Sequence, residues 1–130
     1  MPIKVLVIDD DPGMTALLGL LLRSYGMDVI SANVSELGLE LARNEKPDVI
    51  TLDLMLPNIN GWQLCKMIRS FSKVPILAVS ALDDPGSIAR ALEAGADEYF
   101  VKPVQSNLLV KSINKLAGKE PANDNQPAPN

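Results

Sequence analysis

The sequence contains no histidine and only one cysteine, Cys65, in 130 residues. Without imidazole the chain cannot carry a Ser-His-Asp triad, a histidine zinc site or a phosphohistidine of its own. A single cysteine excludes a disulfide within the chain and a cysteine-based metal cluster, and it fits a reducing compartment. The simplest interpretation of Cys65 is a small hydrophobic side chain that packs inside the protein.

Long hydrophobic runs and an excess of positive charge are also missing. The longest strongly apolar stretch, residues 14–22, is far shorter than the roughly 20 residues that a membrane-spanning helix needs. The N-terminus has neither the basic flank nor the cleavage site of a signal peptide. The 16 Asp and Glu residues outnumber the 12 Lys and Arg, a net charge of -4, which argues against a nucleic-acid-binding face. We therefore expect a cytoplasmic protein that binds neither membranes nor nucleic acid directly.

What the sequence has is an alternation of short apolar runs with amphipathic segments. Apolar residues make up 47% and charged residues 22%, the balance of one soluble globular domain. The short runs are rich in β-branched residues and predict strands buried on both faces. The expected strands cover residues 3–8, 27–31, 48–52, 75–79 and 96–101. The expected helices cover residues 12–25, 35–46, 62–71, 84–94 and 106–117.

Local signals mark the ends and faces of these helices. Asp11 followed by Pro12 is typical of an N-cap with proline at the first helical position. Ser35 is expected to cap the second helix in the same way. Helical spacing predicts that three apolar side chains of the fourth helix face inward: Ile88, Ala91 and Leu92.

Five strands alternating with five helices predict a doubly wound α/β fold. Right-handed crossovers then give a five-stranded parallel sheet that is covered by helices on both faces. Residues 1–118 are expected to form this domain. Residues 119–130 (KEPANDNQPAPN) contain three prolines and no large apolar side chain, so we expect a flexible polar tail there.

Four aspartates follow two of the expected strands, at the sheet edge where ligands bind in open parallel α/β folds. Alone, the run Asp9–Asp11 is typical of a solvated turn and Asp53 of a residue that begins a loop. If the two strands are neighbours, however, they lie about 4.8 Å apart. Asp9, Asp10 and Asp53 would then form a pocket that needs a compensating cation. Oxygen ligands without nitrogen or sulfur favour Mg²⁺.

Two further polar residues follow the fourth and fifth strands at the same edge. Alone, Ser80 is typical of a turn or cap and Lys102 of a solvated surface charge. Beside an acidic pocket, Lys102 can neutralise a carboxylate or bind a phosphoryl oxygen, and the Ser80 hydroxyl can donate to a bound oxyanion. Together these residues predict a site that moves a phosphoryl group onto a carboxylate.

Four sequence motifs carry these residues, each at the end of its own strand. They are VIDD at 7–10, LDLMLP at 52–57, AVSA at 78–81 and YFVKP at 99–103. With these motifs the chain resembles the receiver (phosphoacceptor) domain of bacterial two-component response regulators, over about residues 3–117. The resemblance implies the flavodoxin-like (βα)5 receiver fold with strand order 2-1-3-4-5. LDLMLP and residues 81–103 look most like the subfamily whose outputs are winged-helix DNA-binding domains.

The resemblance implies that Asp53 is the phosphoacceptor, which attacks a phosphohistidine on a partner and becomes an acyl phosphate. It also implies that Mg²⁺ is held by four residues at this edge: Asp9, Asp10, Asp53 and, through its backbone carbonyl, Met55. Such a receiver assists its own phosphorylation and dephosphorylation and is not an enzyme with a separate substrate.

Further residues match the positions that read out phosphorylation in this family. Ser80 and Lys102 would bind phosphoryl oxygens, and Tyr99 would be the aromatic switch that turns inward when Ser80 moves. The Lys102–Pro103 bond matches the family's cis peptide. These residues would switch the face formed by the fourth helix, fifth strand and fifth helix for partner binding.

The resemblance also names partners. The phosphoryl donor would be a sensor histidine kinase or a histidine phosphotransfer protein. The receiving partner would be an effector protein, an output domain outside this sequence, or a second copy in a phosphorylation-dependent homodimer. Leu108 and Ser112 stand where the winged-helix subfamily has its charged dimer contacts, so the chain departs from that subfamily on this face.

Two alternatives stay open at the level of the sequence. A receiver-like scaffold would bind partners regardless of phosphorylation. A phosphohydrolase of the haloacid-dehalogenase kind would use Asp9 as nucleophile and Asp11 as acid, but the chain shows no cap domain and no acidic pair after the fourth strand that matches the later motifs of that family.

Overall fold

The five apolar runs form the five strands of one parallel sheet, β1 (Lys4–Ile8), β2 (Asp28–Ala32), β3 (Val49–Asp53), β4 (Ile76–Ser80) and β5 (Glu98–Val101). The structure is a computed structural model that describes residues 2–118. The predicted tail at 119–130 lies outside the described residues. The strand order is β2-β1-β3-β4-β5, which confirms the predicted parallel α/β fold.

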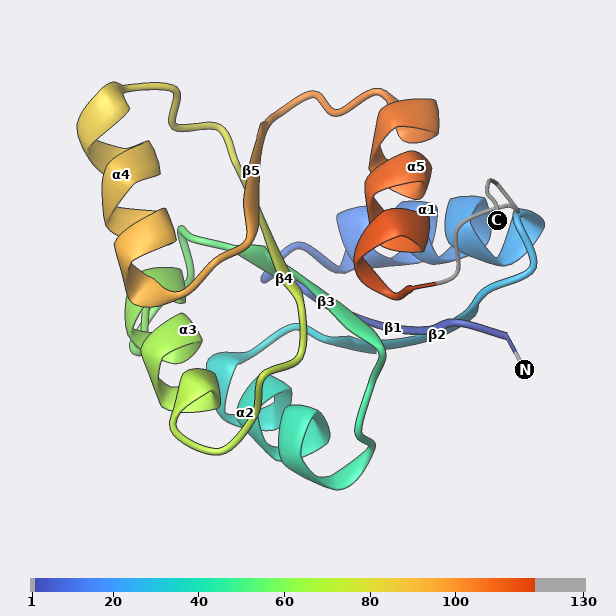
Figure 1. The fold of residues 1–130 in the computed structure, drawn as a ribbon, viewed down its shortest axis with the longest axis horizontal. Helices are drawn as coiled ribbons and strands as arrows, with labels where there is room; N and C mark the ends of the chain where they lie inside the picture. The colour runs from blue at the N-terminus through green and yellow to red at the C-terminus, as the bar shows by residue number, and fades with distance from the viewer. Residues whose placement is uncertain (1, 119–130) are drawn as a thin grey trace.

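The five helices cover the two faces of the sheet. They are α1 (Pro12–Ser24), α2 (Ser35–Asn44), α3 (Gly61–Arg69), α4 (Pro85–Ala94) and α5 (Ser106–Leu116). Helices α1 and α5 lie on one face, and α2, α3 and α4 on the other (Figure 1). No helix within residues 2–118 is long and apolar enough to cross a lipid bilayer.

A hydrophobic core fills each side of the sheet because the strand side chains alternate between its faces. Leu6, Ile50 and Leu52 pack with Leu64 and Ile68 of α3. On the other side, Val5, Val7 and Leu77 pack with Leu22 of α1 and with Leu109 and Ile113 of α5. Nearly all of these side chains are fully buried, so the strands are rigid supports for whatever follows their carboxyl ends.

The helix ends follow the sequence signals with one exception. Asp11 caps α1 as predicted, since its side chain accepts a hydrogen bond from the Gly13 amide and Pro12 is the first helical residue. The prediction that Ser35 caps α2 is wrong, because Val34 is the N-cap and makes no side-chain cap bond. Ser35 is instead a buried first residue of the helix, and its hydroxyl donates to the Ile59 carbonyl at 2.5 Å.

One predicted core residue of α4 points outward. Ala91 and Ala94 are buried, and Ile88 is partly buried. The inward prediction for Leu92 is wrong, since 46% of the residue is exposed. Small alanines let α4 lie close to the sheet, and Leu92, one residue from Ala91, is turned about 100° away from the core.

Candidate functional site

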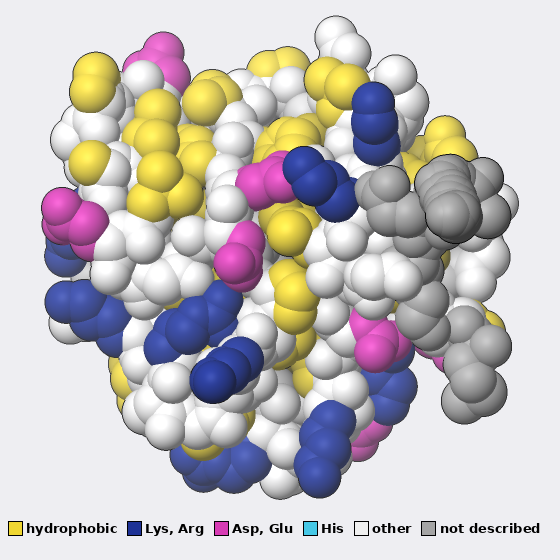
Figure 2. All heavy atoms as spheres, in the orientation of Figure 1, with side chains coloured by type: hydrophobic (Ala, Val, Ile, Leu, Met, Phe, Trp, Pro, Cys, Tyr) yellow, Lys and Arg dark blue, Asp and Glu magenta, His cyan; other side chains and the backbone are white. Residues whose placement is uncertain are grey.

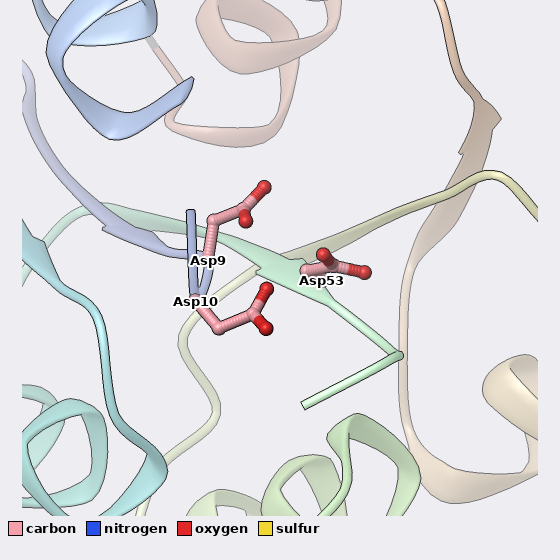
Figure 3. A group of neighbouring side chains, drawn as sticks. All are labelled: Asp9, Asp10 and Asp53. Carbon is pink, nitrogen blue, oxygen red and sulfur yellow. The ribbon is translucent and has the colours of Figure 1, made fainter. Parts of the chain in front are cut away.

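Asp9, Asp10 and Asp53 lie together because β1 and β3 are neighbours in the sheet. Asp53 is the last residue of β3, one position later than the expected strand end, and Asp9 follows β1 directly. Each of the three carboxylates offers an oxygen that lies within 4.8 Å of the others. Figure 3 shows the side chains around one space beyond the ends of these strands. Asp9 and Asp53 are buried, whereas Asp10 is exposed.

Lys102 reaches this cluster from the end of β5. Its ammonium lies 3.0 Å from Asp9 Oδ2 and 3.3 Å from Asp53 Oδ2. Partial burial lowers the pKa of Lys102, but the hydrogen bond to Asp9 and the charges of both aspartates outweigh it, so the pKa is raised overall. Lys102 is therefore charged at neutral pH. The following Lys102–Pro103 peptide bond is cis.

The pKa of the Asp53 carboxyl is raised in the folded protein. Burial raises its pKa, the hydrogen bond from the Met55 amide and the charge of Lys102 lower it, and nearby Asp9 raises it again, so the net shift is upward. The Met55 amide donates to Asp53 Oδ1 at 3.0 Å. The Lys102 ammonium contacts two of the three carboxylates, those of Asp9 and Asp53. The three carboxylates together carry more negative charge than this ammonium offsets, which favours binding of a cation.

Ser80 and Tyr99 connect the next two strands to the loop that precedes α4. Ser80 ends β4, is fully buried, and accepts a hydrogen bond on Oγ from the Leu82 amide at 3.2 Å. The Tyr99 hydroxyl donates to the Leu82 carbonyl at 2.7 Å. Both predicted switch residues therefore hold the same loop residue, Leu82, from neighbouring strands.

Asn33 belongs to the site's support and was not predicted. It follows β2, and its side-chain amide donates to the Asp9 backbone carbonyl at 2.8 Å and lies 3.1 Å from the Thr15 hydroxyl oxygen. These bonds fix the backbone that carries Asp9. The carboxyl end of β2 lies at the same edge as the other strand ends, so the rule that identified Asp53 and Ser80 would also have identified Asn33.

An open groove borders the acidic cluster at Asp10. It has a volume of about 430 Å³ and is lined by Asp10, Met55, Leu82 and Trp62, among others. Met55 is 55% exposed at this groove. The Trp62 indole donates to the Ser87 carbonyl at 3.3 Å, which joins the start of α3 to the first turn of α4. The groove therefore leaves open space beside Asp10.

Comparison with known proteins matches residues 5–114 to a family described as the response regulator receiver domain. The transcriptional regulatory protein AfsQ1 of Streptomyces coelicolor is 44% identical over 89% of the chain and 51% of its own length. The probable transcriptional regulator ycf27 of Porphyridium aerugineum is 38% identical over 95% of the chain and 53% of its own length. The chain thus spans about half the length of these relatives.

A solved structure agrees with the sequence comparison. The BeF3-activated N-terminal receiver domain of RstA from Klebsiella pneumoniae superimposes with a TM-score of 0.84 at 30% identity. The match covers 88% of the chain and 97% of that domain.

Proposed function

Because the chain belongs to the response regulator receiver domain family, and so to two-component signalling, we propose that Asp53 accepts a phosphoryl group in the presence of Mg²⁺. The observation that carries the proposal is the cluster of three carboxylates, two of which contact the Lys102 ammonium, with the buried Asp53 at the end of β3. Phosphoryl transfer depends on positioning and on opposing the charge of the transferred group. This cluster has the residues for both.

In the proposed step, an Asp53 carboxylate oxygen forms a bond to phosphorus while the P–N bond of a donor phosphohistidine breaks. The electron pair of that bond stays with the imidazole of the donor, and Asp53 becomes an acyl phosphate. Lys102, which lies 3.3 Å from Asp53 Oδ2, would bind a phosphoryl oxygen. The Ser80 hydroxyl would donate to another.

The acidic residues Asp9, Asp10 and Asp53 would hold Mg²⁺, together with the Met55 backbone carbonyl. A bound Mg²⁺ would supply positive charge against both the carboxylates and the phosphoryl oxygens. The donor set fits, because it consists of oxygens with no competing nitrogen or sulfur. Asp9 also accepts from the Asp11 amide at 2.9 Å, which orients its carboxylate.

Phosphorylation would be read out through the loop before α4. If the Ser80 hydroxyl turns to a phosphoryl oxygen, it gives up its bond from the Leu82 amide, and the Tyr99 bond to the Leu82 carbonyl changes with the loop. The surface behind this loop carries exposed Leu92, Val101 and Leu108, and hydrophobic side chains gather over α4 (Figure 2). This face would bind an effector, an output domain or a second copy.

The partners follow from the chemistry of the acceptor. A sensor histidine kinase or histidine phosphotransfer protein would supply the phosphoryl group, since the chain has no histidine. Such a transfer from an ATP-dependent kinase places the proposed reaction in the cytoplasm. The receiver assists its own phosphorylation and dephosphorylation and has no separate substrate in this proposal.

The test is incubation with Mg²⁺ and acetyl phosphate, followed by intact-mass analysis. We expect one phospho-adduct that is lost on treatment with hydroxylamine, and none in Asp53→Asn or without Mg²⁺. Asp83→Asn, which changes an exposed aspartate outside the cluster, is the matched control and should be labelled like the wild type. Labelling that persists in Asp53→Asn would contradict the proposal. Partner binding that is unchanged by Asp53→Asn and by beryllofluoride would favour the scaffold alternative.

A further inference from the structure

A basic groove lies at the amino ends of β3 and β4, away from the acidic cluster at their carboxyl ends. The loop between α2 and β3 forms one wall and the loop between α3 and β4 forms the other. Both loops lie at the lower end of the molecule in Figure 1. Lys and Arg side chains, dark blue, gather over this lower part in Figure 2. Positive charge is therefore concentrated here, in a chain whose net charge is -4.

Three cationic side chains of the groove have no acidic partner. They are Arg43, Lys46 and Lys73, all exposed, and none of them forms an ion pair within residues 2–118. Among the described residues that line the groove, Asp48 is the only acidic one. Its Oδ2 already accepts a hydrogen bond from the Lys4 backbone amide at 2.8 Å. The groove thus carries an excess of positive charge, which attracts an anion.

Arg43 is positioned in a way that leaves its hydrogen-bond donors available. Its guanidinium carbon lies 4.5 Å from the centroid of the Phe71 ring. Stacking on a ring uses the face of the guanidinium and leaves the N–H groups at its edge free. Such an edge binds two oxygens of a phosphate at once. Phe71 therefore orients a side chain that is suited to phosphate, and Lys46 and Lys73 add charge beside it.

Hydrogen bonds hold the backbone of the groove in place. Arg69 donates to the Ser72 and Val74 carbonyls at 3.3 and 2.6 Å, which fixes the loop between α3 and β4. The Ile50 amide donates to the Pro75 carbonyl at 2.9 Å and joins this loop to β3. A groove that is already ordered loses less conformational entropy when a ligand binds.

Lys46 has a backbone conformation that lysine rarely adopts. Its φ is 47°, in the left-handed region, where the Cβ of most residues is too close to the backbone. It follows Glu45, the C-cap of α2, at a position where helices commonly end in glycine. Residues held in this region are enriched at binding sites. Here the unusual residue supplies one of the three cations.

The size and lining of the groove favour a small molecule over a segment of a partner protein. Its volume of about 460 Å³ lies in the range of small-molecule sites, roughly 300–1,000 Å³. Besides the cations, its lining includes apolar side chains against which a planar ring can pack, those of Pro47, Phe71, Val74 and Pro75. The groove thus combines phosphate-binding groups with an apolar wall.

We propose that this groove binds a small anion that carries a chain of two or more phosphate groups. Arg43 binds phosphate oxygens through its N–H edge, and Lys46 and Lys73 offset the remaining negative charge. A nucleoside triphosphate and an inorganic polyphosphate share this chemistry, and the apolar wall favours the nucleotide. The site uses neither Asp53 nor Mg²⁺, so its test is independent of the proposed phosphorylation.

Titration of the isotope-labelled protein with ATP, followed by NMR of the backbone amides, tests the proposal. EDTA is present so that neither ATP nor the acidic cluster holds a divalent cation. We expect saturable shifts within residues 42–48 and 71–75, with a dissociation constant below about 1 mM. Arg43→Ala/Lys73→Ala should weaken binding at least about tenfold, because two charge-assisted contacts are lost. Both side chains are exposed, so the rest of the spectrum should match that of the wild type.

Arg90→Ala/Lys111→Ala is the matched control. It removes the same charge, and Arg90 also stacks on an aromatic ring, since it lies 4.3 Å from the Trp62 ring centroid. Neither Arg90 nor Lys111 lines the groove, so the dissociation constant should not change. Equal weakening in the two double variants would overturn the proposal, because net charge alone would then explain the binding. The absence of saturable shifts up to about 10 mM ATP would overturn it as well.

Two parts of ATP, tested separately, identify the source of the phosphate chain. Tripolyphosphate should shift the same amides, and adenosine should not. Tripolyphosphate that binds as tightly as ATP would assign the groove to inorganic polyphosphate, and weaker binding would assign it to a nucleotide; both results support recognition of the phosphate chain. Adenosine that binds as tightly as ATP would contradict it. So would a hexaglutamate peptide that binds the groove when ATP and tripolyphosphate do not, since the partner would then be an acidic protein segment.

Discussion

The two ends of the β-sheet each carry a cluster of charged side chains, and the clusters differ in how their charges are balanced. At the amino ends of β4 and β5, Arg69 lies 3.0 Å from Asp97, and Asp97 also accepts from the Ile76 amide at 2.8 Å. The remaining donors of the guanidinium bind three backbone carbonyls, those of Gly95, Ser72 and Val74. Each charge in this cluster has its partner within the chain.

At the carboxyl ends of β1, β3 and β5, by contrast, Lys102 pairs with Asp9 and Asp53, and Asp10 adds a third negative charge to the cluster. The first cluster joins α3, β4 and β5 and is complete without a ligand. The second has more negative than positive charge in a partly buried position, an arrangement that is costly unless a cation binds. A cluster whose negative charge exceeds its positive charge is therefore the better candidate for a binding site than one in which every charge is paired.

The largest effect on stability is expected at the Arg69 cluster, at the amino ends of β4 and β5. Arg69→Ala should lower the free energy of unfolding by about 3 kcal/mol, because it leaves Asp97 without its ion-pair partner and three backbone carbonyls without their donor. Urea unfolding measures this loss. Arg43→Ala is the matched control: Arg43 is exposed and stacks on the Phe71 ring at 4.5 Å, so its removal should cost less than about 1 kcal/mol. Equal losses in the two variants would show that the Arg69 cluster is not the stabilising one.

Mg²⁺ should stabilise the protein only through the acidic cluster at the carboxyl ends of the strands. At about 100 times its dissociation constant, a ligand of the native state adds about 2.7 kcal/mol to the free energy of unfolding. We expect most of this gain to disappear in Asp10→Asn and to persist in Asp28→Asn, which changes an exposed aspartate at the start of β2. Thermal unfolding with and without Mg²⁺ measures the gain. An undiminished gain in Asp10→Asn would remove Asp10 from the proposed metal site.

The carboxyl-end cluster was largely predictable from the sequence because each strand is buried on both faces and ends in a polar residue. In a parallel sheet such ends meet at one edge, which brings Asp9, Asp53 and Lys102 together from positions far apart in the chain. The exact strand ends were less predictable. Asp53 and Ser80 continue the strand hydrogen bonding where their polarity indicates a loop.

The amino-end cluster could not be predicted in the same way. Arg69 binds mainly backbone carbonyls, and carbonyls carry no signal in the sequence. The inward prediction for Leu92 failed for a related reason. Helical spacing is compatible with more than one buried face of α4. The close packing of Ala91 and Ala94 against the rest of the core determines which face is buried.

Removing the charge of Asp53 should stabilise the protein in the absence of Mg²⁺. Burial raises the pKa of this carboxyl in the folded state, so the folded protein binds the proton more tightly than the unfolded chain, and stability is lost as pH rises through the folded pKa. Asp53→Asn should therefore raise the free energy of unfolding at pH 7 by about 1 kcal/mol. The difference between the variant and the wild type should vanish below about pH 4, where the Asp53 carboxyl is protonated in both the folded and the unfolded wild type. Urea unfolding across this range measures it, and a less stable variant at pH 7 would contradict the sign.

The smallest effect is expected at Ser80, and a second buried serine provides its control. Both side chains are buried, but Ser80 Oγ accepts only a 3.2 Å bond from the Leu82 amide, whereas Ser35 Oγ donates to the Ile59 carbonyl at 2.5 Å. Ser80→Ala should lower the free energy of unfolding by less than about 1 kcal/mol, and Ser35→Ala by about 1.5 kcal/mol. If Ser80→Ala lowers the free energy of unfolding as much as Ser35→Ala, the Ser80 hydroxyl already stabilises the loop that precedes α4. A small loss in the free energy of unfolding would mean that the Ser80 hydroxyl is available to turn toward a phosphoryl group. In the same way, the excess of negative charge in the acidic cluster leaves Asp53 available for a cation.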